Sequence, residues 1–236
     1  EHEYASMLLT NRADGLIQLD HSFPFSEQDA HLVDHLPVIS ICERIEGDKK
    51  YPVIELDNYA AARAVTHHLI SYGHRSFGVI AGQICSQIHT DRLAGIKSVL
   101  AEEGIVFDDA MLVGGSYKIE TGVEGVQQLL SLSQRPTAII CFNDDIAIGA
   151  LYAIKKHGLT VPDDISVTGF DNIRVAAYMD PPLTTVDQPA YQMGRRAVEV
   201  LIQQINRQPL TRTREILPFS LLERQSTGPV FKPNQH

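Results

Sequence analysis

Several polar side chains stand at the ends of predicted elements, where they could bind a small ligand. Asp171 follows the apolar run from Ile165 to Phe170, which predicts a buried strand with the carboxylate at its C-terminal end. Open α/β sheets place their ligand-contacting groups at that end of the strands. A carboxylate there accepts hydrogen bonds from ligand hydroxyls or amines. The alternative is that Asp171 and Asn172 cap the short helix that follows.

Arg92 is the candidate for a positively charged residue that contacts the ligand. We predict that it lies in the first turn of a helix that begins at Thr90 or Asp91. The helix dipole disfavours a cation there by about 0.3–1 kcal/mol, so the guanidinium needs another partner. Its planar set of donors suits ligand oxygen atoms. The alternative is an ion pair with a nearby acid such as Asp91, although adjacent helical residues point in different directions.

Asn143 follows a predicted strand and precedes a long helix. Helix capping explains an asparagine here, and acids in the first turn suit the dipole, so a ligand contact is only one of two interpretations. The paired acids Asp144 and Asp145 do not predict a metal site. Consecutive helical residues point apart, and no histidine lies at ligand spacing.

Tyr117 and Gln188 complete the set of candidate ligand-binding residues. Tyr117 follows Gly114-Gly115, which permits close backbone approach, and its ring either stacks on a ligand or lies on the surface. Gln188 follows a predicted strand, where it either hydrogen-bonds a ligand or serves as a hinge. Cys42 ends another strand, and packing explains it better than a ligand contact.

Motifs for catalysis or for phosphate binding are absent from the sequence. Zinc-protease, nucleophile-elbow, P-loop and dinucleotide-binding patterns do not occur. No nucleophile has a base at a recognisable spacing. We therefore expect a binding protein and not an enzyme, with no cofactor and no metal.

Short apolar runs alternate with helical patterns along the chain, which predicts an α/β protein with doubly wound parallel sheets. We expect strands at 16–19, 38–41, 53–56, 77–81, 111–113, 138–142, 165–170, 184–186 and 217–222. We expect helices at 58–72, 91–103, 120–132, 144–157 and 189–206. Three of these helices end in a glycine, at Gly73, Gly104 and Gly158.

Composition excludes several classes of function. A net charge of −9 without a basic cluster argues against direct binding of nucleic acid by these residues. No apolar run approaches the roughly 20 residues that span a membrane, and no secretory signal is visible. Three scattered cysteines do not predict a disulfide scaffold. We expect a cytoplasmic protein without a membrane partner.

Longer ordered strings carry a resemblance to a known family. They are ADGLIQL, HHLISYGHRSFGVIAG, RLAG, TAIICFNDDIAIGAL, DISVTGFDN and DPPLTTVDQP, which together extend over nearly the whole chain. In this order they resemble the effector-binding core of the lactose/galactose-repressor (LacI/GalR) family of bacterial transcription factors. The segments FPF and ELDNYAAA are most similar to its cytidine-responsive members.

The resemblance implies a periplasmic-binding-protein-like fold, in which three crossovers join two subdomains and the ligand lies in the cleft between them. Subdomain one would comprise 1–57 with 188–208, and subdomain two 58–187 with 209–227, leaving 228–236 as a tail. The family's effector contacts match Asp171 and the arginine of RLAG, Arg92. Some members also use the positions of Asn143 and Tyr117.

The resemblance also implies partners. Family members carry a helix-turn-helix domain and a strand-helix-strand unit before the ADGL strand, so we expect both to lie outside this sequence and the first subdomain to be incomplete. The expected function is the core of a homodimeric repressor whose effector, a nucleoside such as cytidine or a sugar, changes affinity for operator DNA. A cyclic-AMP-responsive activator is a further implied partner. The alternative is a sugar-binding protein of a transporter, because the two share a fold.

Overall fold

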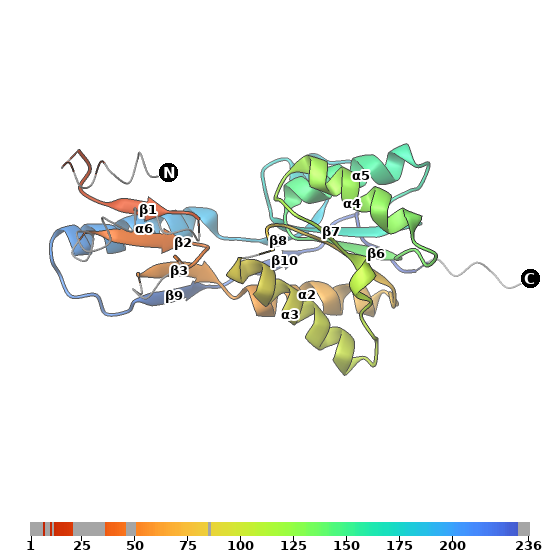
Figure 1. Ribbon diagram of the computed structural model, residues 1–236, viewed down its shortest axis with the longest axis horizontal. Coiled ribbons are helices and arrows are strands. Elements are labelled where there is room, and N and C mark those ends of the chain that lie inside the picture. Colours follow the sequence, from red (N-terminus) through yellow and green to blue (C-terminus); the bar gives the residue numbers. More distant parts are fainter. Residues whose placement is uncertain are drawn as a thin grey trace, which may run out of the picture. The chain divides into compact units, whose positions relative to one another are not determined.

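The chain divides into two compact units in the computed structural model, which describes residues 7, 10, 12–20, 36–45, 51–84 and 86–230 (Figure 1). Unit one comprises Glu1–Asp57 and Pro189–Pro218, and unit two comprises Asn58–Gln188 and Phe219–His236. The backbone therefore passes from one unit to the other three times.

Among the described residues of unit one, four strands form a parallel sheet. They are β1 (Leu16–Gln18), β2 (Val38–Ile41), β3 (Val53–Leu56) and β9 (Arg214–Leu217), in the order β1-β2-β3-β9. Helix α6 (Ala190–Ile205) packs against β1, β2 and β3. Its buried Met193 and Ala197 meet Ile39 and Ile54 of the sheet, which forms the core of this unit.

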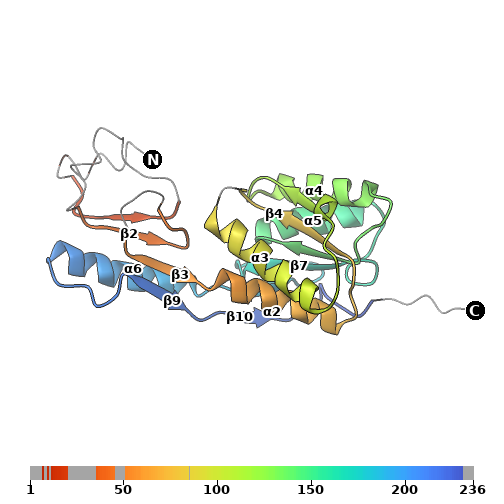
Figure 2. The same ribbon diagram turned by 60° about the horizontal axis from the view of Figure 1, so that its bottom comes forward.

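Unit two contains a six-stranded sheet in the order β10-β8-β7-β6-β4-β5. Its strands are β4 (Phe77–Ala81), β5 (Leu112–Gly114), β6 (Ala138–Cys141), β7 (Ser166–Asp171), β8 (Thr184–Asp187) and β10 (Ser220–Leu222). Only β10 runs antiparallel to its neighbour in this sheet. Helices α2 (Asn58–Ser71) and α3 (Gln87–Glu102) cover one face, and α4 (Ile119–Ser131) and α5 (Asp144–Lys156) the other (Figures 1 and 2).

Burial on both faces explains why the central strands β4 and β6 are apolar throughout and do not alternate. Every residue of β4 and β6 is buried. The helices that cover the sheet end as predicted, because Gly73, Gly104 and Gly158 all take a positive φ that favours glycine. Among the described residues, no helix combines the length and the apolar character needed to cross a membrane.

The predicted α/β class and the mostly parallel sheets are confirmed, and most predicted elements agree with the observed ones to within a residue at each end. The predicted strand at 217–222 is wrong. Pro218 separates two strands, β9 and β10, which pair in different sheets. Since β9 pairs with β3, residues 209–218 belong to unit one, whereas the sequence analysis placed them in subdomain two. Gln188 belongs to unit two, whereas the sequence analysis placed it in subdomain one.

Candidate functional site

The five candidate effector-binding residues all lie in unit two. Parallel strands end at one edge of a sheet, here called the carboxyl edge, so side chains that follow β4 to β8 gather there. Asp171 is the last residue of β7, Asn143 follows β6, Gln188 follows β8, and Tyr117 lies in the loop after β5. Arg92 reaches the same edge from α3, because it contacts the residue that follows β6.

Arg92 is buried, with 4 % of its surface exposed, and its contacts fix the guanidinium at the carboxyl edge. Its Nε donates to Asn58 Oδ1 at 2.8 Å, and Nη1 donates to the carbonyl oxygen of Phe142. The guanidinium carbon lies 3.3 Å from the centroid of the Phe170 ring, over its face. A buried cation between a backbone carbonyl and an aromatic face is well placed to meet an acidic or polar partner.

The predicted position of Arg92 on its helix is wrong. Helix α3 begins at Gln87, because the Ser86 hydroxyl caps it by accepting from the backbone N–H of His89 at 3.1 Å. Arg92 therefore lies in the second turn and not in the first. Asp91, the acid named in the alternative interpretation, accepts from Gln87 Nε2 at 2.7 Å.

Asp171 is half-buried at the same edge as Arg92, and the electrostatic environment of its carboxyl is unusual. Burial raises the pKa of its carboxyl to about 7, even though the positive charge of Arg92 lowers it. The negative charges of Asp144 and Asp145 add to the rise. The carboxyl is therefore only partly ionised near neutral pH and favours a partner that donates hydrogen bonds to it.

The backbone at Asp171 takes an uncommon conformation. Asp171 has φ 107° and Asn172 φ 54°, both in the region that side chains other than glycine rarely adopt. Hydrogen bonds hold the turn, since Asn172 donates to Asp187 Oδ1 at 2.7 Å and accepts from Arg224 Nη2 at 2.8 Å. The capping alternative is wrong, because the short helix 176–178 has Val175 at its N-cap and no side-chain cap bond.

Asn143 caps α5, as one of its two interpretations predicts. Its Oδ1 accepts from the Ile146 N–H at 2.8 Å, and its Nδ2 donates to the carbonyl oxygen of Tyr117 at 3.3 Å. The second bond ties the loop after β5 to the start of α5. Asn143 thus positions neighbouring groups of the carboxyl edge, including the loop that carries Tyr117.

The Tyr117 ring packs against the backbone of Gly82, which follows β4. A Cβ atom added at Gly82 would lie 2.2 Å from two ring carbons of Tyr117, so only glycine leaves room for the ring. Tyr117 is half-buried, and the alternative of an exposed surface tyrosine is not what is observed. Gln188 is also half-buried and is the last residue of unit two before the chain enters unit one.

Asp144 has a structural role that the sequence analysis did not find. Its carboxyl is fully buried and accepts from the Thr185 hydroxyl at 2.6 Å and from the Ile173 N–H at 2.8 Å. Burial raises its pKa to about 6, while these hydrogen bonds oppose the rise. It joins α5 to β8 and to the loop after Asp171.

The described residues contain no group of three acidic, histidine or cysteine side chains arranged to hold a metal ion.

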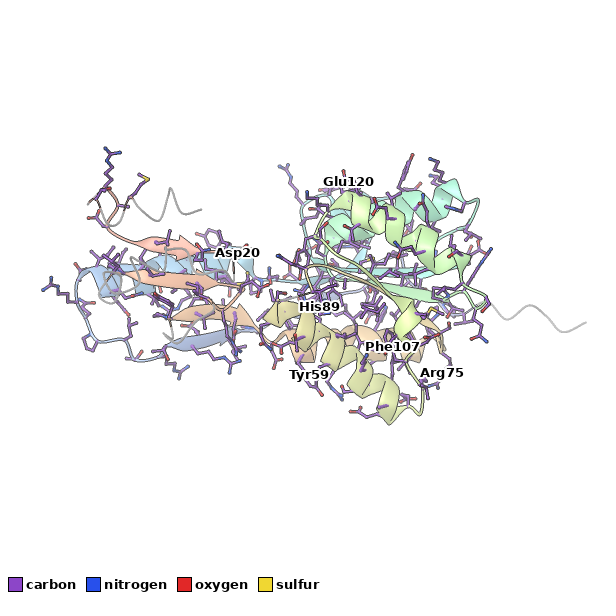
Figure 3. All side chains as sticks on the ribbon, in the orientation of Figure 1. Asp20, Tyr59, Arg75, His89, Phe107 and Glu120 are labelled. Carbon is purple, nitrogen blue, oxygen red and sulfur yellow. The ribbon has the colours of Figure 1, made fainter. Side chains whose placement is uncertain are left out.

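His89 was also missed. It lies at the start of α3, and only 6 % of its surface is exposed (Figure 3). Its ring meets the Phe142 ring edge-on, with centroids 5.5 Å apart. Ser86 followed by His89 is the spacing of a helix cap and its third helical residue, and that signal would have placed His89 and Arg92 on one helix face.

Comparisons of the sequence and of the structure with known proteins point to the same family. A family described as a periplasmic binding protein-like domain matches residues 66–227. The chain is 34 % identical over 229 residues to the HTH-type transcriptional repressor CytR of Escherichia coli strain K12, covering 96 % of this chain and 66 % of that protein. It is 37 % identical over 233 residues to the HTH-type transcriptional repressor PurR of Erwinia tasmaniensis, covering 97 % and 67 %.

A solved structure agrees with these sequence matches. The transcription regulator CcpA of Lactococcus lactis aligns with a TM-score of 0.86 and 27 % identity, covering 96 % of this chain and 83 % of that one. The chain spans about two thirds of the length of the curated relatives named here.

Proposed function

The chain belongs to the periplasmic-binding-protein-like family of lactose/galactose-repressor type, and from that premise we propose that it is the effector-binding core of a bacterial transcriptional repressor. Its relatives by sequence are named as repressors. We propose that it acts by binding, without catalysis, and works in the cytoplasm. The similarity to repressors does not favour the alternative of a transporter's sugar-binding protein.

The observation that carries the proposal is that Arg92 and Asp171 lie at the same carboxyl edge and interact electrostatically. Arg92 is buried and Asp171 is half-buried, and the charge of Arg92 acts on the carboxyl of Asp171. A ligand with neighbouring hydroxyls can donate to the carboxylate and accept from the guanidinium. We propose that Arg92 and Asp171 contact the effector, with contributions from Asn143, Tyr117 and Gln188.

We propose a nucleoside, with cytidine as the first compound to test, as the effector. The resemblance to cytidine-responsive regulators supports this choice, and a ribose presents the vicinal hydroxyls that suit an acid beside an arginine. Tyr117, packed over Gly82, offers an aromatic group at the same edge. A sugar shares the hydroxyl chemistry and is the competing effector class.

Operator DNA and a second copy of the chain are the proposed macromolecular partners. The net charge of −9 leaves DNA binding to a helix-turn-helix domain outside these residues. Helix α6 exposes a stripe of apolar side chains, which supports a homodimer through unit one. The stripe comprises Tyr191, Val198, Ile202 and Ile205. A cyclic-AMP-responsive activator is a further partner that the cytidine-type resemblance suggests.

The proposed mechanism is a shift between two states of the protein. An effector changes operator affinity only to the extent that it binds one state more tightly than the other. By linkage, operator DNA must then change effector affinity by the same factor. Reciprocal titrations of the full-length protein would measure this coupling.

The first test is thermal unfolding of the protein with a panel of nucleosides and sugars. A ligand present at a hundred times its dissociation constant adds about 2.7 kcal/mol to the free energy of unfolding. We expect cytidine to raise the melting temperature of the wild type but not of Arg92→Ala. A rise with sugars alone would reassign the effector, whereas no rise with any compound would contradict the proposal.

A further inference from the structure

His89 presents an unusual combination of burial and incomplete hydrogen bonding. Its Nδ1 atom is buried and has no hydrogen-bond partner among the described residues. The backbone N–H of His89 donates to the Ser86 hydroxyl and so leaves this ring nitrogen unaccounted for. A buried polar atom without a partner costs about 1–3 kcal/mol, so such an atom in a native protein requires an explanation.

The position of His89 relates it to the candidate site. His89 and Arg92 are three residues apart on α3, which places their side chains on one helix face. Both contact Phe142, since the His89 ring meets the Phe142 ring and Arg92 donates to the Phe142 carbonyl. The next residue, Asn143, binds the Tyr117 loop. His89 therefore belongs to the same carboxyl edge as the other candidates.

We infer that His89 is a further effector-binding residue, whose Nδ1 hydrogen-bonds a neutral polar group of the effector and so contributes to its specificity. The inference rests on the proposed function, because it assigns a residue to that same site. A neutral effector group, such as a hydroxyl or the edge of a nucleobase, would supply the partner that Nδ1 lacks.

The protonation state of His89 agrees with a neutral ligand group. Burial lowers the pKa of His89 below its ordinary value of 6.5, so the imidazole is neutral at physiological pH. A neutral imidazole donates from one ring nitrogen and accepts at the other. It therefore favours a polar group without charge over a phosphate, which a cationic histidine would attract.

The test compares variants that differ in which ring nitrogen they imitate. Asparagine places a polar atom near the position of Nδ1, glutamine reaches the position of Nε2, and phenylalanine keeps a ring without hydrogen bonding. We would measure cytidine binding by calorimetry for the wild type, His89→Asn, His89→Gln and His89→Phe, with thermal unfolding of each. Cytidine is the probe because it is the first effector candidate.

We expect His89→Phe and His89→Gln to bind cytidine roughly tenfold more weakly, and His89→Asn to stay within about threefold of the wild type. If the Phe variant does not fold, the Asn and Gln variants still separate the two nitrogen positions. Wild-type affinity in a folded His89→Phe variant would overturn the inference, as would equal losses in the Asn and Gln variants. A wild type that binds no compound of the panel would instead remove the proposed function, and this inference with it.

Discussion

The two edges of the sheet in unit two both bury polar side chains, but they satisfy them differently. At the opposite edge, here called the amino edge, His74 bonds Thr137 Oγ1 at 2.9 Å through Nδ1. Its Nε2 lies 3.0 Å from Ser166 Oγ and 3.1 Å from the carbonyl oxygen of Gly228. Both ring nitrogens therefore have partners, and the network ties the C-terminal segment to the strand starts.

The carboxyl edge instead holds a buried cation, a half-buried acid of raised pKa and a histidine nitrogen without a partner among the described residues. Its backbone also departs from common geometry, at Asp171 and Asn172. Complete polar networks rigidify a fold, whereas strained and incompletely bonded groups gather at functional sites. The contrast is the one expected if the amino edge stabilises the unit and the carboxyl edge is the proposed ligand site.

The largest expected effect is on stability, at the amino edge. His74→Ala removes one hydrogen-bond partner from each of three groups and leaves a cavity, so we expect the free energy of unfolding to fall by about 3 kcal/mol, as measured by urea denaturation. Cytidine affinity should not change at a temperature where the variant is folded. The exposed His67→Ala on α2 is the matched control. A large loss of affinity in folded His74→Ala would erase the distinction between the edges.

At the carboxyl edge the expected effect is reversed. Asp171→Asn removes the charged acceptor, and hydrogen bonds to charged groups contribute about 1.5–3 kcal/mol, so affinity should fall by tenfold to a hundredfold. Stability should not decrease, because burial disfavours the ionised carboxyl in the folded protein. Asp163→Asn, in an exposed turn, is the control. Unchanged calorimetric affinity in Asp171→Asn would remove Asp171 from the site.

The two edges should also respond differently to pH. Asp171, with a pKa of about 7, is mostly ionised at pH 8 and mostly protonated at pH 6. A ligand that donates to the carboxylate should bind about tenfold more weakly at pH 6 than at pH 8. Titrations across this range should show the dependence in the wild type and not in Asp171→Asn. A pH-independent affinity would mean that the ligand does not contact the carboxylate.

At the amino edge, the direction of the pH dependence of stability follows from His74 and from His68 of α2, whose Nε2 lies 2.9 Å from Oγ1 of Thr227, the residue before Gly228. Burial lowers the pKa of both below 6.5, so the unfolded chain takes up protons first as the pH falls. Their contribution to stability is therefore complete above about pH 6.5 and is lost as the pH falls toward the lower pKa of the folded state. His74→Ala should show a weaker loss of stability on acidification than the wild type.

The smallest expected effect concerns the packing of Tyr117. Gly82→Ala forces the Tyr117 ring to move. The overpacking should lower the free energy of unfolding, or weaken the free energy of cytidine binding, by about 1 kcal/mol. Gly194→Ala is the control, because a Cβ added there meets no atom within 4 Å. If Gly82→Ala binds and unfolds like the wild type, the position of Tyr117 does not matter for either property.

The sequence predicted the strand positions and the helix ends, which depend on local patterns of residues. Apolar runs located the strands and helical glycines located the helix ends, because burial and backbone geometry act residue by residue. The same reasoning missed β9, since its pairing with β3 joins segments far apart in the chain. A strand's partner is set by tertiary contacts, and no local signal assigned residues 214–217 to unit one.

The candidate site was predictable in its residue types but not in its local geometry. Strand-end positions identified Asp171 and Asn143, because parallel strands deliver their last residues to one edge. The positive φ of Asp171 has no sequence signal, as the residue is not glycine. Asp144 was considered only as a first-turn acid and as a metal ligand, and its bonds to Thr185 and Ile173 depend on elements that meet in the folded unit.

The central claim, that ligand binds at the carboxyl edge, is tested most directly by mapping backbone amide resonances during titration with cytidine or the panel compound that most raises the melting temperature. The account predicts shifts at Gly82, His89, Tyr117, Asp171 and Gln188, with little change at Thr137, Ser166 and Gly228. Shifts concentrated around Thr137 and Ser166, or spread evenly over unit two, would contradict it.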